Sequence, residues 1–124
     1  MLKIVFTGDA PQAIGPYSQA ICVNGMVFTS GQIGLTPKGD LVVGIENQTR
    51  QVLNNLQAVL KEANSGLSKV IKTTIFLSDM EYFARVNQIY AEFFGEHKPA
   101  RSTVAVKTLP KDALVEIECI ALVE

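Results

Sequence analysis

Two carboxylates interrupt an apolar stretch at the end of the chain. The segment ALVEIECIALVE covers residues 113–124, where Glu116 and Glu118 stand among residues typical of a buried strand. A carboxylate removed from water needs a cationic or hydrogen-bonding partner, or its pKa rises. One of the two could act as a base or hold a water molecule, and solvated charges on a strand edge are the alternative. A glycosidase-like pair fits poorly, because residues two apart on one strand point the same way.

Arg101 is the cation whose position suits a small carboxylate. It stands between Pro99 and a predicted strand that begins at Ser102, so its backbone is restrained. A guanidinium binds a carboxylate through two parallel hydrogen bonds, which the ammonium of lysine cannot do. Arg101 is therefore a candidate for carboxylate binding, and an ordinary solvent-exposed arginine is the alternative.

Three further positions could line a ligand site. Tyr17 offers a phenol beside a glycine-bent loop, although a half-buried tyrosine with its hydroxyl at the surface is the more usual arrangement. Gly31 follows Ser30 and would let a backbone amide approach a ligand, although a plain turn explains it equally well. Asn87 lies on a predicted helix, where it could simply belong to the polar face. Each position thus has a structural alternative beside the functional one.

The composition narrows the chemistry. Eleven Lys and Arg against 12 Asp and Glu give a net charge of -1, with no general attraction for nucleic acid or an anionic membrane. His97 is the only histidine, so the chain lacks the residues for a histidine-rich metal site and for most Ser-His hydrolase mechanisms. Cys22 and Cys119 form no C-x-x-C pair and are expected to be small apolar core residues. No metal or cofactor is expected, and residues 1–124 are expected to form one soluble cytoplasmic domain.

The elements that must position these residues follow from turn signals and periodicity. Asn24-Gly25 between two β-type runs predicts a hairpin. Apolar residues at three- and four-residue spacing predict a helix from Glu46 to near Asn64. Ser78 and Glu81 form a capping box that starts a second helix. Strands are predicted at residues 3–6, 18–23, 26–30, 70–77, 102–106 and 113–123.

The order of elements, β-β-β-α-β-α-β-β, predicts an α+β fold in which two helices cover one face of a mixed sheet. The second helix carries an apolar stripe that includes Phe83 and Tyr90. The last strand is apolar on both faces apart from its two glutamates. Because two helices suffice for one layer, another subunit is expected to cover the opposite face, which predicts a homo-oligomer built sheet to sheet.

Four segments, taken together in this order, resemble the Rid family of reactive-intermediate deaminases, also called the YjgF family. They are IGPYSQA at 14–20, SGQIGLTPKG at 30–39, HKPARSTV at 97–104 and LPKDALVEIECIA at 109–121. The similarity extends over nearly the whole chain and is closest to the RidA-like 2-iminobutanoate/2-iminopropanoate deaminases. It implies a chorismate-mutase-like fold and a homotrimer whose sheets form a central barrel, with three clefts between subunits.

The resemblance also implies roles for individual residues. Arg101 would bind the substrate carboxylate, and Glu116 would position the water that attacks the imine carbon. Many relatives have cysteine where this chain has Thr103, and threonine should preserve function if that position contributes its backbone carbonyl to the water. Glu118 receives no role in catalysis and is expected to be structural. The positions that line the family's cleft are Tyr17, Ser30, Gly31 and Asn87.

The activity that the resemblance implies is hydrolysis of small 2-imino acids and enamines to 2-oxo acids and ammonia, without a cofactor. The substrates are 2-aminoacrylate, 2-iminopropanoate and 2-iminobutanoate, and their removal protects pyridoxal-phosphate enzymes. A regulatory trimer that binds small carboxylates without turnover is the main alternative, because it would use the same cleft. An endoribonuclease or translation inhibitor, also attached to the family's name, fits poorly, because the chain lacks a basic stripe and a catalytic histidine pair.

Overall fold

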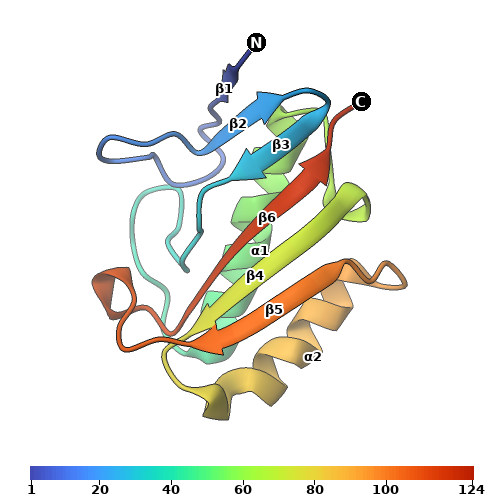
Figure 1. Cartoon of the computed structure of the whole chain (residues 1–124). Coiled ribbons are helices and arrows are strands. Elements are labelled where there is room, and N and C mark those ends of the chain that lie inside the picture. Colours follow the sequence, from blue (N-terminus) through green and yellow to red (C-terminus); the bar gives the residue numbers. More distant parts are fainter.

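Six strands form one mixed sheet in the computed structural model, which describes residues 1–124 (Figure 1). The strands are β1 (Lys3–Val5), β2 (Ala20–Val23), β3 (Met26–Thr29), β4 (Val70–Leu77), β5 (Ala100–Ala105) and β6 (Val115–Leu122). Their order across the sheet is β1-β2-β3-β6-β4-β5. β5 runs parallel to β4, and all other neighbours are antiparallel. The last strand of the sequence therefore lies in the middle of the sheet.

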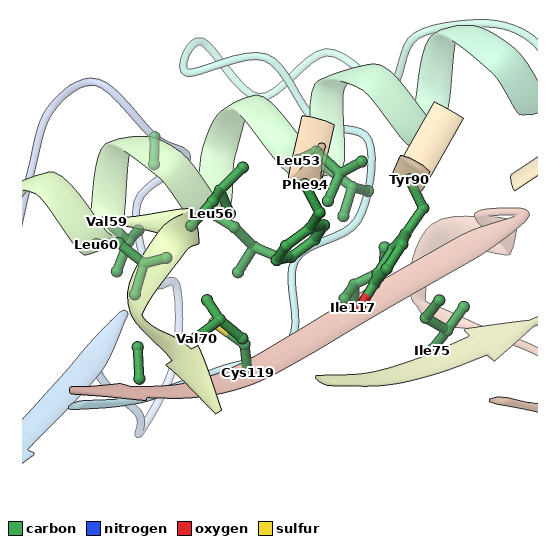
Figure 2. Packing of buried hydrophobic residues seen from close by; sticks show 14 of the residues in the cluster. Leu53, Leu56, Val59, Leu60, Val70, Ile75, Tyr90, Phe94, Ile117 and Cys119 are labelled. Atoms are coloured by element: carbon green, nitrogen blue, oxygen red, sulfur yellow. The ribbon is translucent and has the colours of Figure 1, made fainter. Parts of the chain in front are cut away.

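Two helices lie on one face of this sheet (Figure 1). α1 covers Ile45–Glu62 and α2 covers Phe83–Phe94. Side chains from both helices join those of β4 and β6 in one core, where Tyr90 reaches toward Ile117 (Figure 2). The predicted α+β fold, with its element order and two helices on one face, is confirmed. Neither helix has the length and apolar character needed to cross a membrane.

The start of α2 differs from the predicted capping box. The side chain of Asp79, not that of Ser78, accepts a hydrogen bond from the Glu81 amide, at 2.9 Å. The amide of Ser78 donates to the Leu114 carbonyl, which keeps Ser78 at the end of the sheet and away from the cap position. A 3-10 turn at Met80–Tyr82 then leads into α2. Asp79 therefore caps the 3-10 turn, and α2 continues from this turn without a side-chain cap of its own.

The central strand β6 shows burial with a period of two. Val115, Ile117 and Ala121 face the helices and are 0% exposed, and Cys119 is 3% exposed. The residues between them are half-buried. Burial raises the pKa of the Cys119 thiol to about 11, so this thiol stays protonated and unreactive at neutral pH. The prediction of Cys119 as an apolar core residue is confirmed, and Cys22 is half-buried.

The sheet face opposite the helices has no covering element in the single chain. A row of apolar side chains crosses it, because the strand register pairs Ile4 with Ile21, Ile21 with Phe28, and Phe28 with Ile120. Ile4 is 67% exposed and Phe28 is 38% exposed. A contiguous apolar row at a protein surface is typical of an interaction surface.

Candidate active site

A cavity of about 550 Å³ lies beside the Glu116 carboxylate. Its walls come from the loop between β1 and β2, the loop after β3 and the turn before β6. Four residues singled out in the sequence line it, and we call them the Glu116 half-site: Tyr17, Ser30, Gly31 and Glu116. Folding thus brings together three segments that are far apart in the chain.

Gly31 makes room for the Glu116 carboxylate. A β-carbon added at Gly31 would lie 2.5 Å from Glu116 Oε2 and 2.8 Å from its carboxyl carbon, so any side chain at this position would force the Glu116 side chain to move. The approach is fixed by Gln32 next to it, because Gln32 and Ile117 exchange two backbone hydrogen bonds of 2.9 and 3.1 Å. Glycine at this position permits the close approach of the Glu116 carboxylate, and no special backbone conformation is involved.

Gly31→Ala is expected to displace the Glu116 carboxylate and lower catalytic efficiency. A misplacement of about 1 Å at a reacting group can reduce a rate by about a hundredfold. Gly66→Ala is the matched control, because nothing lies within 4 Å of a β-carbon there and the backbone is extended, with φ of -175°. Steady-state kinetics of the hydrolysis that the sequence resemblance implies would measure the loss, and equal activity of the two variants would contradict a role for Glu116 in that reaction.

Ser30 uses its side chain to hold the loop that carries Tyr17. Its hydroxyl donates to the Ser18 carbonyl at 2.5 Å, and its amide donates to the Gln19 carbonyl at 2.9 Å. Gln19 is 2% exposed, and its amide group bonds the backbone of Thr7 twice and that of Pro11 once. The buried Gln19 contacts therefore fix the wall of the cavity from which the half-exposed Tyr17 ring projects.

The environment of Glu116 favours its neutral form more than water does. Burial raises the pKa of the Glu116 carboxyl, and the negative charge of Glu118 raises it further. The three ion pairs of the chain leave Glu116 without a cationic partner. A half-buried carboxylate with a perturbed pKa and an open cavity in front of it is a candidate for acid-base chemistry.

Arg101 lines a second cavity, of about 410 Å³, with Asn87 and Tyr90 of α2. Its Nη1 donates to Asn87 Oδ1 at 2.7 Å. The guanidinium carbon lies 4.9 Å from the centroid of the Tyr90 ring and 5.5 Å from that of Phe83. We call Asn87 and Arg101 the Arg101 half-site. Arg101 lies within β5, not before it as predicted, because it pairs with Thr73 of β4.

The contact between Arg101 and two aromatic rings was missed by sequence reasoning. Phe83 and Tyr90 belong to the apolar stripe of α2, and their pattern predicts only a core role. Together with Asn87 they are spaced by four and three positions, which places all three on one helix face. The sequence therefore indicates that these three side chains share one helix face. It does not indicate that β5, which carries Arg101, lies beside that face.

Arg101 and Glu116 lie on opposite faces of the sheet. Thr73, which pairs with Arg101, is fully buried beneath the helices, whereas Phe76 pairs with Glu116. Residues three apart on a strand point to opposite faces. One chain therefore does not bring the Arg101 guanidinium into the Glu116 half-site.

The two remaining positions lie outside both half-sites. Thr103 faces the helices like Arg101, and its Oγ1 is buried without a hydrogen-bond partner. Glu118 lies on the open face, where it lines a small hollow with Lys72 and Thr74. It forms no ion pair within the chain. The chain itself thus supplies no cationic partner at ion-pair distance for Glu118.

The fold and the half-sites define a class of small α+β proteins, with two helices on one face of a six-stranded mixed sheet and polar residues on both faces. The chain belongs to the Rid family, also called the YjgF family. The family described as endoribonuclease L-PSP matches residues 7–123. The resemblance carried by the four sequence segments is confirmed.

Similar proteins share both the fold and much of the sequence. Chloroplastic Reactive Intermediate Deaminase A of Arabidopsis thaliana is 50% identical, over 96% of this chain and 65% of that protein. The structure of the Rid-family protein YyfA from Yersinia pestis is 54% identical, with a TM-score of 0.97 and coverage of 99% of this chain and 100% of that one. The structure of E. coli TdcF with bound serine is 43% identical, with a TM-score of 0.94 and coverage of 98% and 99%. These relatives support a Rid-type deaminase function in general.

Proposed function

We propose that this protein hydrolyses small 2-imino acids and their enamine tautomers in the cytoplasm, and so protects pyridoxal-phosphate enzymes. The substrates are 2-aminoacrylate, 2-iminopropanoate and 2-iminobutanoate, and the products are 2-oxo acids and ammonia. The observation that carries the proposal is the Glu116 carboxylate, which is half-buried, without a cationic partner, and open to a cavity. The family relationship supports the same chemistry, because an Arabidopsis relative is named a deaminase.

In the proposed mechanism, Glu116 accepts a hydrogen bond from a water molecule and directs its oxygen toward the imine carbon. Water adds to the C=N bond while Glu116 takes one proton from the water and passes it to nitrogen, which gives a carbinolamine. Glu116 then transfers the proton of the new hydroxyl group to the same nitrogen, and the C–N bond breaks to leave the C=O bond of the 2-oxo acid and ammonia. The raised pKa makes the ionised Glu116 a stronger base than an ordinary glutamate. Free imines already hydrolyse in water, so orientation of one water molecule and one substrate suffices for a useful acceleration.

The proposed contacts with substrate and water come from both half-sites and from Thr103. The Arg101 guanidinium binds the substrate carboxylate through the donors that Asn87 does not occupy. Tyr17, Ser30 and Gly31 shape the pocket around the imine, and Thr103 contributes its backbone carbonyl to the water. This last contact does not depend on a thiol, so threonine replaces the cysteine of many relatives without loss.

The proposed site forms between copies of the chain. Because Arg101 and Glu116 lie on opposite sheet faces, a complete site needs Arg101 from one copy and Glu116 from another. The uncovered apolar row from Ile4 to Ile120 supports contact between sheets of different copies. We infer a homotrimer of single Rid-type domains, whose sheets form a central barrel and whose threefold symmetry gives three equivalent clefts.

A coupled assay tests the proposed function. Threonine dehydratase releases the enamine of 2-iminobutanoate, and addition of this protein is expected to speed the appearance of 2-oxobutanoate by at least about tenfold over the uncatalysed hydrolysis. An unchanged rate would contradict the proposal.

A binding measurement and an RNA-cleavage assay, together with the coupled assay, separate the alternative functions. A regulatory trimer would bind 2-oxobutanoate with simple saturation and leave the rate of its formation unchanged. An endoribonuclease would cleave RNA when highly purified and at raised salt, and its activity would survive Glu116→Gln, which the proposed hydrolysis would not.

A further inference from the structure

The Arg101 side chain is held by one face of α2. Asn87 Oδ1 accepts a hydrogen bond from Nη1 at 2.7 Å, and the guanidinium carbon lies 4.9 Å from the Tyr90 ring centroid and 5.5 Å from that of Phe83. A cation within about 6 Å of a ring face is attracted by the ring quadrupole. No carboxylate of the chain forms an ion pair with Arg101. Its charge is therefore oriented by neutral groups and remains available to an external anion.

Tyr90 is the most firmly fixed of these neighbours. Its side chain is 7% exposed, and its ring stacks on that of Phe94 with centroids 4.4 Å apart. Its hydroxyl is 2.7 Å from Thr73 Oγ1, and Thr73 is the residue that pairs with Arg101 across β4 and β5. The ring is thus tied to the strand beside that of Arg101. The Tyr90 ring therefore offers the Arg101 guanidinium a rigid surface. Figure 2 shows the Tyr90 side chain directed from α2 toward the sheet.

We propose that Tyr90 is a positioning residue: its ring, assisted by that of Phe83, holds the Arg101 guanidinium in the orientation that binds the substrate carboxylate. The inference rests on the proposed function and adds to it a residue that does not touch the substrate. An unrestrained arginine loses rotamer freedom when a ligand fixes it, and a guanidinium already held against rings loses less. Tyr90 therefore acts on affinity for the carboxylate and not on the chemical step.

Three variants test separately the hydroxyl of Tyr90, the ring of Tyr90 and the ring of Phe83. Tyr90→Phe keeps the ring and loses the hydrogen bond to Thr73, Tyr90→Leu removes the ring, and Phe83→Leu removes the second ring. We expect KM for 2-iminobutanoate, and the calorimetric Kd for 2-oxobutanoate, to rise about fivefold to tenfold in Tyr90→Leu and about twofold to threefold in Phe83→Leu. Both constants are expected to stay within about twofold of the parent in Tyr90→Phe, with kcat within about twofold in all three.

Two further measurements distinguish positioning from a general loss of structure. In an Arg101→Ala background, Tyr90→Leu is expected to leave the Kd for 2-oxobutanoate unchanged, because the group that Tyr90 positions is gone. The Nε–H resonance of Arg101, assigned by its loss in Arg101→Lys, is expected to show slower side-chain motion in ligand-free parent protein than in Tyr90→Leu. If Tyr90→Leu does not fold, Phe83→Leu provides both comparisons, because Phe83 is only half-buried.

A Kd for 2-oxobutanoate unchanged by removal of either ring would overturn the inference, and so would an equal loss in the Arg101→Ala background. Failure of the proposed function looks different. In that case the parent protein leaves the rate of 2-oxobutanoate formation unchanged, whatever effect Tyr90→Leu has on the Kd for 2-oxobutanoate.

Discussion

Arg101→Ala is expected to lower kcat/KM for 2-iminobutanoate by at least about a hundredfold, mainly through KM. Charge-assisted, bidentate hydrogen bonds to a carboxylate are among the strongest that a side chain forms, and water does not replace them in a fixed orientation. Lys98 lines the same cavity, but its ammonium is a point charge without the planar fork of a guanidinium. Steady-state kinetics of the dehydratase-coupled reaction give both constants.

Arg50→Ala is the matched control for this prediction. Arg50 is a half-exposed arginine that pairs with Glu92 at 3.0 Å on the surface of the helices, and its removal is expected to leave the kinetics unchanged. Arg101→Lys should fall between the parent and Arg101→Ala, because it keeps the charge and loses the fork. Parent-like kcat/KM in Arg101→Ala would remove Arg101 from the active site.

Mixed trimers of two inactive variants are expected to regain activity. Subunits with Arg101→Ala still carry Glu116, and subunits with Glu116→Ala still carry Arg101. If each cleft combines Arg101 of one copy with Glu116 of the next, every trimer that contains both kinds of subunit has one intact cleft. At a substrate concentration near the parent KM, heterotrimers isolated through two different affinity tags should therefore show about one third of the parent rate, whereas either homotrimer shows almost none.

The control for this experiment is a single chain that carries both substitutions. Mixed with either single variant, it completes no cleft, so these mixtures are expected to stay inactive. If the two single variants also fail to restore activity in verified heterotrimers, the two residues do not meet across a subunit boundary. The position of Arg101 and Glu116 on opposite sheet faces would then exclude a shared site, and the proposed mechanism with it.

The hairpin between β2 and β3 illustrates what local chemistry makes predictable. Asn24 and Gly25 adopt φ angles of 51° and 76°, in the left-handed region that tight hairpin turns require, and Val23 pairs with Met26 across the turn. Asn-Gly is the dipeptide that accepts these angles most readily, so two residues were enough for the prediction. The start of α2 shows the limit of such signals. Ser78 and Asp79 are both good caps, and the structure uses Asp79, while the Ser78 amide donates to the carbonyl of Leu114, a residue distant in the chain.

Candidate site residues could be named from the sequence, but whether they lie together in space could not. The sequence marks four residues as site candidates, and the structure places them around one cavity: Tyr17, Ser30, Gly31 and Glu116. The closeness of Gly31 to Glu116 depends on the backbone pairing of Gln32 with Ile117, which no local pattern encodes. The aromatic support of Arg101 depends likewise on where β5 lies relative to α2.

The sequence by itself determined the family, the element order and, through the period-two pattern of β6, the placement of Glu116 and Glu118 on the face away from the core. Only the tertiary structure decided that Arg101 faces the helices while Glu116 faces the open side. That outcome depends on the register of β4 with both β5 and β6. Register between distant strands is set by long-range packing, and shifting it by one residue would reverse the face of every side chain. The period-two pattern of one strand therefore shows which of its residues lie on the same face. It does not show which residues of another strand lie on that face.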